Sequence, residues 1–133
     1  MTILAIDFGG TQVKSALVSE EFVIEKSLPT QSSPQTLEQA IDVIDQIVTS
    51  VETDLSGIAI SVPGTVYTEE GVIYHGGLLR FFHGFRIKEV LEAKYHLPVM
   101  ALNDGKAAAL AELATGHLQG VTNGAALVLG SGL

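Results

Sequence analysis

The N-terminal segment imposes the strongest constraint on how this chain can fold. An apolar run over residues 3–6 leads to Asp7, Gly9 and Gly10 follow, and apolar alternation resumes after Thr11. This order predicts two antiparallel strands joined by a tight turn, with a carboxylate at the end of the first strand.

The turn between these strands has two interpretations. Glycines leave backbone N–H groups free to reach phosphate oxygens, and such turns often need a positive φ. Asp7 could then hold a hydrated Mg²⁺, and Thr11 could bond the terminal phosphate. The alternative is a plain hairpin with a Gly-Gly turn, and these residues alone do not separate the two.

Composition narrows the class of protein. The chain has 133 residues, 47% of them hydrophobic, which is enough for one domain with a buried core. The formal charge is −8 and the seven Lys and Arg are spread thinly, so we expect no nucleic-acid partner. The absence of cysteine excludes disulfides and thiolate metal sites in this segment. No apolar run reaches about 18 residues and no signal-peptide pattern is present, so we expect no membrane contact and a cytoplasmic protein.

The rest of the chain alternates between strand and helix patterns. We expect a third antiparallel strand over residues 22–28, a loop over 29–35, an amphipathic helix over 37–51, a central strand over 57–62, a small hairpin over 65–74, a helix over 87–95, a strand over 98–102, a helix over 107–114 and a last strand over 125–129. Strands 57–62 and 98–102 are nearly all apolar, which predicts burial, on both faces for 57–62. This order predicts an α/β fold with parallel crossovers.

Three strand ends carry polar or glycine residues. They are Asp7, Pro63-Gly64 and Asn103-Asp104. Because ligands of open α/β sheets collect at the carboxyl ends of strands, one crevice could hold all three.

These motifs carry a family resemblance. In order and spacing, Asp7 to Thr11, Ser61 to Gly64, and Leu97 to Val99 with Asn103-Asp104 and the helix 107–112 resemble the N-terminal half of a ROK-family sugar kinase. That family belongs to the actin-like ATPases, in which two ribonuclease-H-like domains close over ATP and substrate. The resemblance implies a ribonuclease-H-like mixed sheet with three N-terminal antiparallel strands and flanking helices. It also implies ATP-dependent phosphorylation of a sugar hydroxyl.

The resemblance further implies roles for individual residues. For the sugar these are Gly64, Gly77, Asn103 and Asp104, with Asp104 as the catalytic base. For ATP and Mg²⁺ they are Asp7, Gly9, Gly10 and Thr11, with Asp7 holding the metal through water, and Gly130, Ser131 and Gly132 of a second phosphate loop.

Each assignment has a simpler structural alternative. Asp104 could serve only as the N-cap of its helix, and Pro63-Gly64 could be only a strand exit. Gly76-Gly77 could be only a loop. The aromatic segment Arg80 to Phe85 could be buried under the domain or against a partner.

The resemblance also sets expectations for the whole protein. Residues 1–133 would be an N-terminal domain truncated at the second phosphate loop, inactive without a C-terminal domain. That domain would carry the adenosine pocket and, if its motif is present, a structural zinc. The full-length protein would be a homodimer. The sugar is left open among glucose, fructose, N-acetylmannosamine and β-glucosides.

Other function classes compete with the kinase. A transcriptional regulator of the same family would carry a winged helix, whereas here Met1 is followed at once by a strand. A non-catalytic sugar sensor would keep Asn103 and lose Asp104 or the glycines. An actin-like structural protein would not need Asn103-Asp104 beside a Pro-Gly loop.

Overall fold

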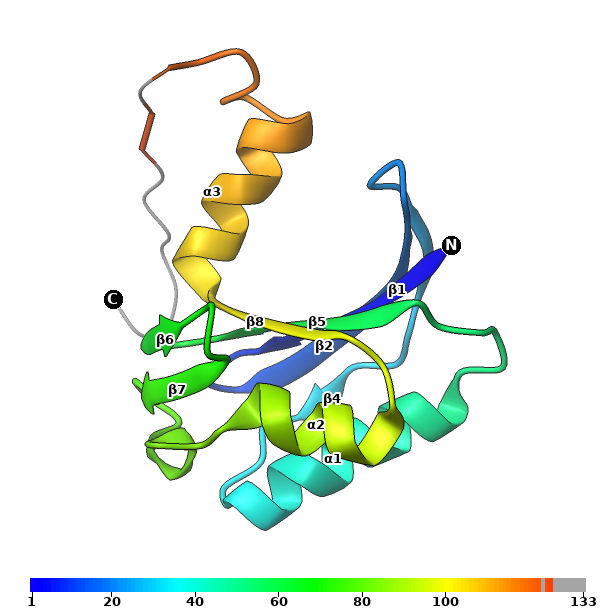
Figure 1. Ribbon diagram of the computed structural model, residues 1–133, viewed down its shortest axis with the longest axis vertical. Coiled ribbons are helices and arrows are strands. Elements are labelled where there is room, and N and C mark those ends of the chain that lie inside the picture. Colours follow the sequence, from blue (N-terminus) through cyan, green and yellow to red (C-terminus); the bar gives the residue numbers. More distant parts are fainter. Residues whose placement is uncertain (123, 126–133) are drawn as a thin grey trace.

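A mixed β-sheet with two helices on one face forms the body of the chain (Figure 1). The computed structural model describes residues 1–122 and 124–125. In chain order the elements are β1 (Thr2–Phe8), β2 (Gln12–Ser19), β3 (Ile24–Ser27), β4 (Gln31–Ser32), α1 (Leu37–Ser50), β5 (Gly57–Val62), β6 (Thr65–Tyr67), β7 (Val72–His75), the 3₁₀ turn η1 (Arg80–Phe82), α2 (Ile87–Tyr95), β8 (Val99–Asn103) and α3 (Asp104–Thr115). None of the helices in the described ranges is both long and apolar enough to cross a bilayer.

The strand order places the carboxyl ends of three strands side by side. The order is β3-β2-β1-β5-β8, with β4 beside β2. The strands β1, β2 and β3 pair antiparallel as expected, and β1, β5 and β8 are parallel. Parallel neighbours need crossover connections, which α1 and α2 provide. The register aligns Asp7 with Ser61 and Ser61 with Leu102, so the three strands end at the same edge of the sheet.

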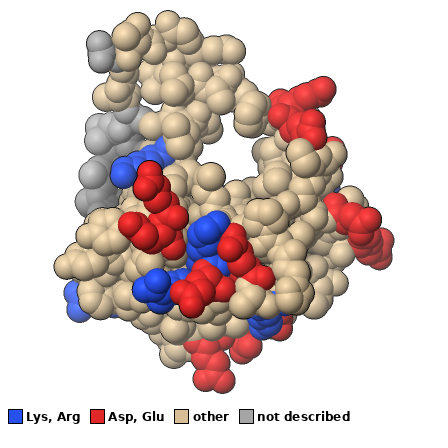
Figure 2. Space-filling model, in the orientation of Figure 1, with Lys and Arg blue, Asp and Glu red and all other residues tan. Residues whose placement is uncertain are grey.

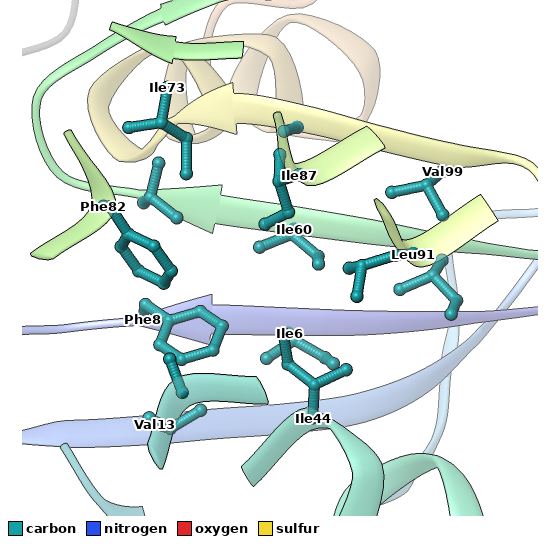
Figure 3. Close-up of a cluster of buried hydrophobic side chains, with 14 of the residues drawn as sticks. Ile6, Phe8, Val13, Ile44, Ile60, Ile73, Phe82, Ile87, Leu91 and Val99 are labelled. Carbon is teal, nitrogen blue, oxygen red and sulfur yellow. The ribbon is translucent and has the colours of Figure 1, made fainter. Parts of the chain in front are cut away.

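Alternate residues of the central strands build the core against α1 and α2. Figure 3 shows Ile6 and Phe8 of β1 and Ile60 of β5 on the side of Ile44 of α1 and Leu91 of α2. All five are at most 2% exposed. The helical spacing of the apolar residues in α1 and α2 thus covers one face of the sheet.

A capping box in modified form lies at the start of α1. The Thr36 Oγ1 accepts a hydrogen bond from the Gln39 N–H at 3.1 Å. The Gln39 Oε1 accepts in return from the Gln35 N–H at 2.9 Å, one residue before the cap. The helix therefore begins at Leu37, as the sequence predicts.

The opposite face of the sheet is open, which corrects one expectation. Strand β5 is buried on one face only, since Ala59 and Ser61 are half-buried, and Met100 of β8 is 54% exposed. The helix α3 projects away from this face instead of lying on it (Figure 1). A hollow of about 440 Å³ lies there, and Figure 2 shows it between α3 and the β2–β3 hairpin. Its apolar lining includes Ala5, Ala16, Ala59, Met100, Leu102 and Ala107.

Several smaller expectations are also corrected. The third strand begins at Ile24, because Phe22 has a φ of 61° and turns the chain between β2 and β3. The predicted loop over 29–35 contains the short strand β4. The helix α3 begins at Asp104, three residues before its alanine run. The last strand predicted, 125–129, falls mainly on residues outside the described ranges.

The aromatic segment after β7 is buried under the domain. Phe82 is 0% exposed, and its ring meets the Phe8 ring edge-on at a centroid distance of 5.3 Å. Phe85 packs against Phe82 at 6.1 Å. Of the two alternatives for Arg80 to Phe85, the structure therefore selects the core for these phenylalanines.

Candidate active site

The carboxyl ends of β1, β5 and β8 bring the three sequence motifs to one edge of the sheet. Asp7 lies at the end of β1 on the open face, where its Oδ1 accepts a hydrogen bond from the Ser61 Oγ at 2.5 Å. Asn103 is the last residue of β8 and lies opposite Val62 of β5. Gly64 follows two residues after Val62. Sequence reasoning assigned no role to Ser61, although its position in the alternation of β5 put it on the face of Asp7.

The Gly9-Gly10 turn is held from both sides. The Gly9 N–H donates to the Gln12 carbonyl at 2.9 Å, and the Ser33 Oγ donates to the Gly9 carbonyl at 2.9 Å. The Ser33 N–H donates to the Thr11 carbonyl at 3.1 Å. The short strand β4 leads directly into Ser33, so it fixes the turn from outside the hairpin.

The backbone angles of this turn differ from one part of the sequence expectation. Neither Gly9 nor Gly10 has a positive φ. A Cβ at Gly9 would lie 3.0 Å from the Gln12 carbonyl oxygen, a tight contact that favours glycine at this position. Gly10 and Thr11 are exposed at its tip.

Gly64 and Gly77 lie backbone against backbone. Gly64 has a φ of 92°, and a Cβ on it would come within 1.9 Å of the His75 carbonyl oxygen. Gly77 has a φ of 59°, and a Cβ on it would lie 2.9 Å from the Gly64 nitrogen. Only glycine fits this pair of positions, because both the backbone angle and the contact forbid a side chain. The pair is therefore a close backbone contact between the segment after β5 and the segment after β7.

Asn103 takes the helix cap that the simpler alternative gave to Asp104. The Asn103 Oδ1 accepts from the Lys106 N–H at 3.1 Å, and its Nδ2 donates to the Gly64 carbonyl. Asp104 is the first residue of α3, and its Oδ1 accepts from the Gly105 N–H at 2.8 Å. The N-cap alternative for Asp104 is thus wrong by one residue. Asn and Asp are about equally good N-caps, so the local sequence does not distinguish Asn103 from Asp104.

The residues at this edge fit a hydrated magnesium ion. Among the described residues, no group of three His, Cys, Asp or Glu side chains could hold a metal on its own. Asp7 instead offers one exposed carboxylate beside a hydroxyl. Mg²⁺ keeps several waters and binds through one or two carboxylates together with substrate phosphates, which matches such a site. The candidate phosphate residues Gly130, Ser131 and Gly132 lie outside the described residues.

Comparison with known proteins gives consistent matches along the chain. The sequence profile described as "ROK family" matches residues 3–133. The beta-glucoside kinase of Listeria monocytogenes is 36% identical over 141 residues, which cover 100% of this chain and 45% of that kinase. The chain spans about half the length of the curated relatives that it matches.

Solved structures of the same family superpose on it. A ROK family protein from Streptococcus pneumoniae TIGR4 in complex with sucrose has a TM-score of 0.78 and 39% identity, over 90% of this chain and 39% of that one. A ROK family glucokinase from Streptomyces griseus in complex with glucose and AMPPNP has a TM-score of 0.81 and 27% identity, over 90% and 38%. These superpositions confirm the expected fold of the actin-like ATPases. With a family match over residues 3–133, this chain belongs to the ROK family.

Proposed function

We propose that residues 1–133 form the N-terminal domain of an ATP-dependent sugar kinase, which transfers the γ-phosphoryl group of ATP to a sugar hydroxyl. The names of its relatives support this activity, since they include a beta-glucoside kinase and a glucokinase with glucose and AMPPNP bound. The second domain would carry the rest of the site, including the adenosine pocket. A structural zinc would belong to that domain as well, if its motif is present there.

The observation that carries the proposal is the division of labour between Asn103 and Asp104. Asn103 caps α3 and ties the Gly64 loop, so Asp104 is not needed for either task. Its Oδ1 accepts only from the adjacent Gly105 N–H, and its Oδ2 has no hydrogen bond within the described part of the chain. A carboxylate held at a strand end by a helix start, with one oxygen available, suits a general base.

In the proposed reaction the sugar lies against Gly64, Gly77 and Asn103. The reacting hydroxyl passes its proton to the Asp104 carboxylate while its oxygen bonds to the γ-phosphorus, and ADP leaves with the electron pair of the broken P–O bond. Positioning and charge stabilisation supply most of the rate enhancement in such transfers, so both domains are needed.

The ATP side of the proposed site lies around Asp7. The Gly9-Gly10 turn and Thr11 would bind the phosphates, and Gly130, Ser131 and Gly132 would contribute to the same task. Asp7 would hold Mg²⁺ through water, and that ion would supply positive charge for the phosphate oxygens. We also propose that the full-length protein acts in the cytoplasm. On the strength of the family resemblance, we propose that it is a homodimer.

The test uses the full-length protein and measures ADP release with glucose, fructose, N-acetylmannosamine and β-glucosides. We expect sugar-dependent release, and we expect Asp104→Asn to lower kcat by roughly 10²–10⁴-fold while sugar binding is retained. The amide keeps an oxygen for the Gly105 N–H, so the fold should not change. Glu38→Gln in the first turn of α1 is the matched control and should leave kcat unchanged.

Two results would contradict the proposal. A change in kcat below about threefold for Asp104→Asn would remove Asp104 from the proton transfer. Sugar binding without any ADP release by the unmodified protein would favour a sensor or a transcriptional regulator.

A further inference from the structure

Four exposed aromatic rings form a row on and beside the β6–β7 hairpin. The ring centroids of Tyr67 and Tyr74 are 5.5 Å apart, those of Tyr74 and His83 are 6.0 Å apart, and those of His83 and His75 are 5.8 Å apart. The Tyr67 and Tyr74 residues are 50% and 54% exposed. Each ring therefore contacts the next, while the row as a whole remains open to solvent.

The row has no task in the core of the hairpin. Val66 and Ile73 point inward and are 6% and 0% exposed, so they provide the packing that holds the hairpin on the domain. Tyr67 and Tyr74 lie on the outer side of the hairpin, where the packing of the domain does not require large side chains. Contiguous exposed aromatic side chains of this kind usually mark a binding surface.

The row begins at the proposed sugar site. The His75 Nδ1 accepts a hydrogen bond from the Gly77 N–H at 3.2 Å, and the His75 carbonyl lies against Gly64. At the other end, Tyr67 lies three residues along β6 from Gly64, which is about 10 Å in an extended strand. Figure 1 shows β6 and β7 beside the start of α3, at the carboxyl edge of the sheet. A separation of about 10 Å is on the scale of two linked rings, one at the glycine pair and the other beside the tyrosines.

We propose that this aromatic row is a second subsite, which receives the aglycone or the second sugar ring of a glycoside. The inference rests on the proposed kinase function and narrows its substrates, from a set that includes free hexoses, to glycosides that carry a second ring. The C–H face of a pyranose, or an aryl group, packs on the electron-rich face of an aromatic ring, and the tyrosine hydroxyls can bond to sugar hydroxyls at its edge. A free hexose would fill only the glycine pair and leave the row unused.

The experiment compares three acceptors with the full-length protein: glucose, methyl β-glucopyranoside and phenyl β-glucopyranoside. The methyl compound has the glycosidic bond but no second ring, so the phenyl-to-methyl ratio of kcat/KM isolates the row. We expect a ratio of roughly ten, because ring contacts of this kind are worth a few-fold each. The ratio should fall towards one in the Tyr67→Ala/Tyr74→Ala double variant.

Two further variants control for other effects. Tyr67→Phe/Tyr74→Phe keeps both rings and should keep most of the ratio. Phe22→Ala removes an exposed ring at the turn between β2 and β3, 65% exposed, and should leave the ratio as it is.

The outcomes separate this inference from the proposed function. A protein that phosphorylates free hexoses and gains nothing from the phenyl group would overturn the inference alone, as would an unchanged ratio in the alanine double variant. A change of oligomeric mass in that variant, without a change of the ratio, would make the row a protein interface. A protein that phosphorylates no sugar at all would overturn the proposed function and this inference with it.

Discussion

Asn103 serves a helix and a loop with the two ends of one amide. Its carbonyl oxygen accepts from the Lys106 N–H, and its amino group donates to the Gly64 carbonyl. The helix α3 and the loop that contains Gly64 are thereby fixed relative to each other. Because only the amino group reaches Gly64, an aspartate at this position would keep the cap and lose the tie.

We predict that Asn103→Asp and Asn103→Ala separate these two contributions. The alanine variant loses both contacts, and its free energy of unfolding should fall by about 1 kcal/mol more than that of the aspartate variant, the usual worth of an N-cap. In both variants the Gly77 amide should exchange faster with solvent, because the Gly64 loop that lies against it is loosened. Urea unfolding and hydrogen exchange measure these effects. Equal unfolding free energies for the two variants would show that the cap contributes nothing.

At the scale of elements, α2 closes the start of the exposed sheet edge. Among the described residues, β8 is the outermost strand on that side, so its outward backbone groups have no strand partner there. The Val99 N–H donates to the Glu92 Oε1 at 3.0 Å, and the Lys88 Nζ donates to the Val99 carbonyl at 3.0 Å. Lys88 and Glu92 also pair with each other at 2.6 Å. One turn of α2 therefore satisfies the first residue of the edge strand.

The contacts of Lys88 and Glu92 with Val99 predict that stability depends on pH. The hydrogen bond from Lys88, and then that from the Val99 N–H, lower the pKa of Glu92 from its usual 4.5. A carboxyl group whose pKa is lower in the folded state stabilises the fold at pH values above its pKa in the unfolded state. This contribution is lost as the pH falls through its pKa in the folded state. We expect Glu92→Gln to lower the unfolding midpoint near pH 7, and we expect the gap to the unmodified chain to close as the pH falls below 4.5.

Thermal unfolding of both chains at several pH values measures that gap. Glu89→Gln is the matched control, because Glu89 pairs with Arg86 on the surface, where the two side chains are 70% and 65% exposed. Such pairs contribute little, so this variant should unfold like the unmodified chain at every pH. A gap for Glu92→Gln that stays constant with pH would show that its charge is not what matters.

At the scale of the whole molecule, the sheet has one face covered by helices and one open face. The helices α1 and α2 cover the first, whereas Met100 and the hollow lie on the second. Parallel strands are normally covered on both sides, so an isolated domain with this shape exposes surface that favours association.

We predict that the 133-residue chain on its own folds, releases no ADP in response to sugar, and self-associates through the open face. Folding is expected because the core between the sheet and its two helices is complete within this chain. Met100→Lys should weaken the association, measured as mass against concentration, without lowering the unfolding midpoint. Val90→Lys places the same charge on an exposed apolar position of α2 and should not affect it. Sugar-dependent ADP release by this chain, abolished by Asp104→Ala, would contradict the prediction.

The sequence by itself determined the elements and the address of the site. Apolar spacing predicted α1 and α2 within a residue of their ends, since each helix needs one apolar stripe. The end of an apolar strand placed Asp7, and the strand exits placed Gly64 and Asn103, because the carboxyl ends of parallel strands share an edge. These features depend on short segments of the chain, so the local sequence is enough to predict them.

Tertiary structure decided what depends on segments that meet only after folding. The bond from Asn103 to Gly64 spans 39 residues of sequence, and no local pattern marks it. The burial of Phe82 depends on Phe8, and the open face of β5 depends on where α3 points. Asn103 and Asp104 both suit the local capping pattern, and in the folded chain Asn103 is the residue that caps α3 while its amino group donates to the Gly64 carbonyl.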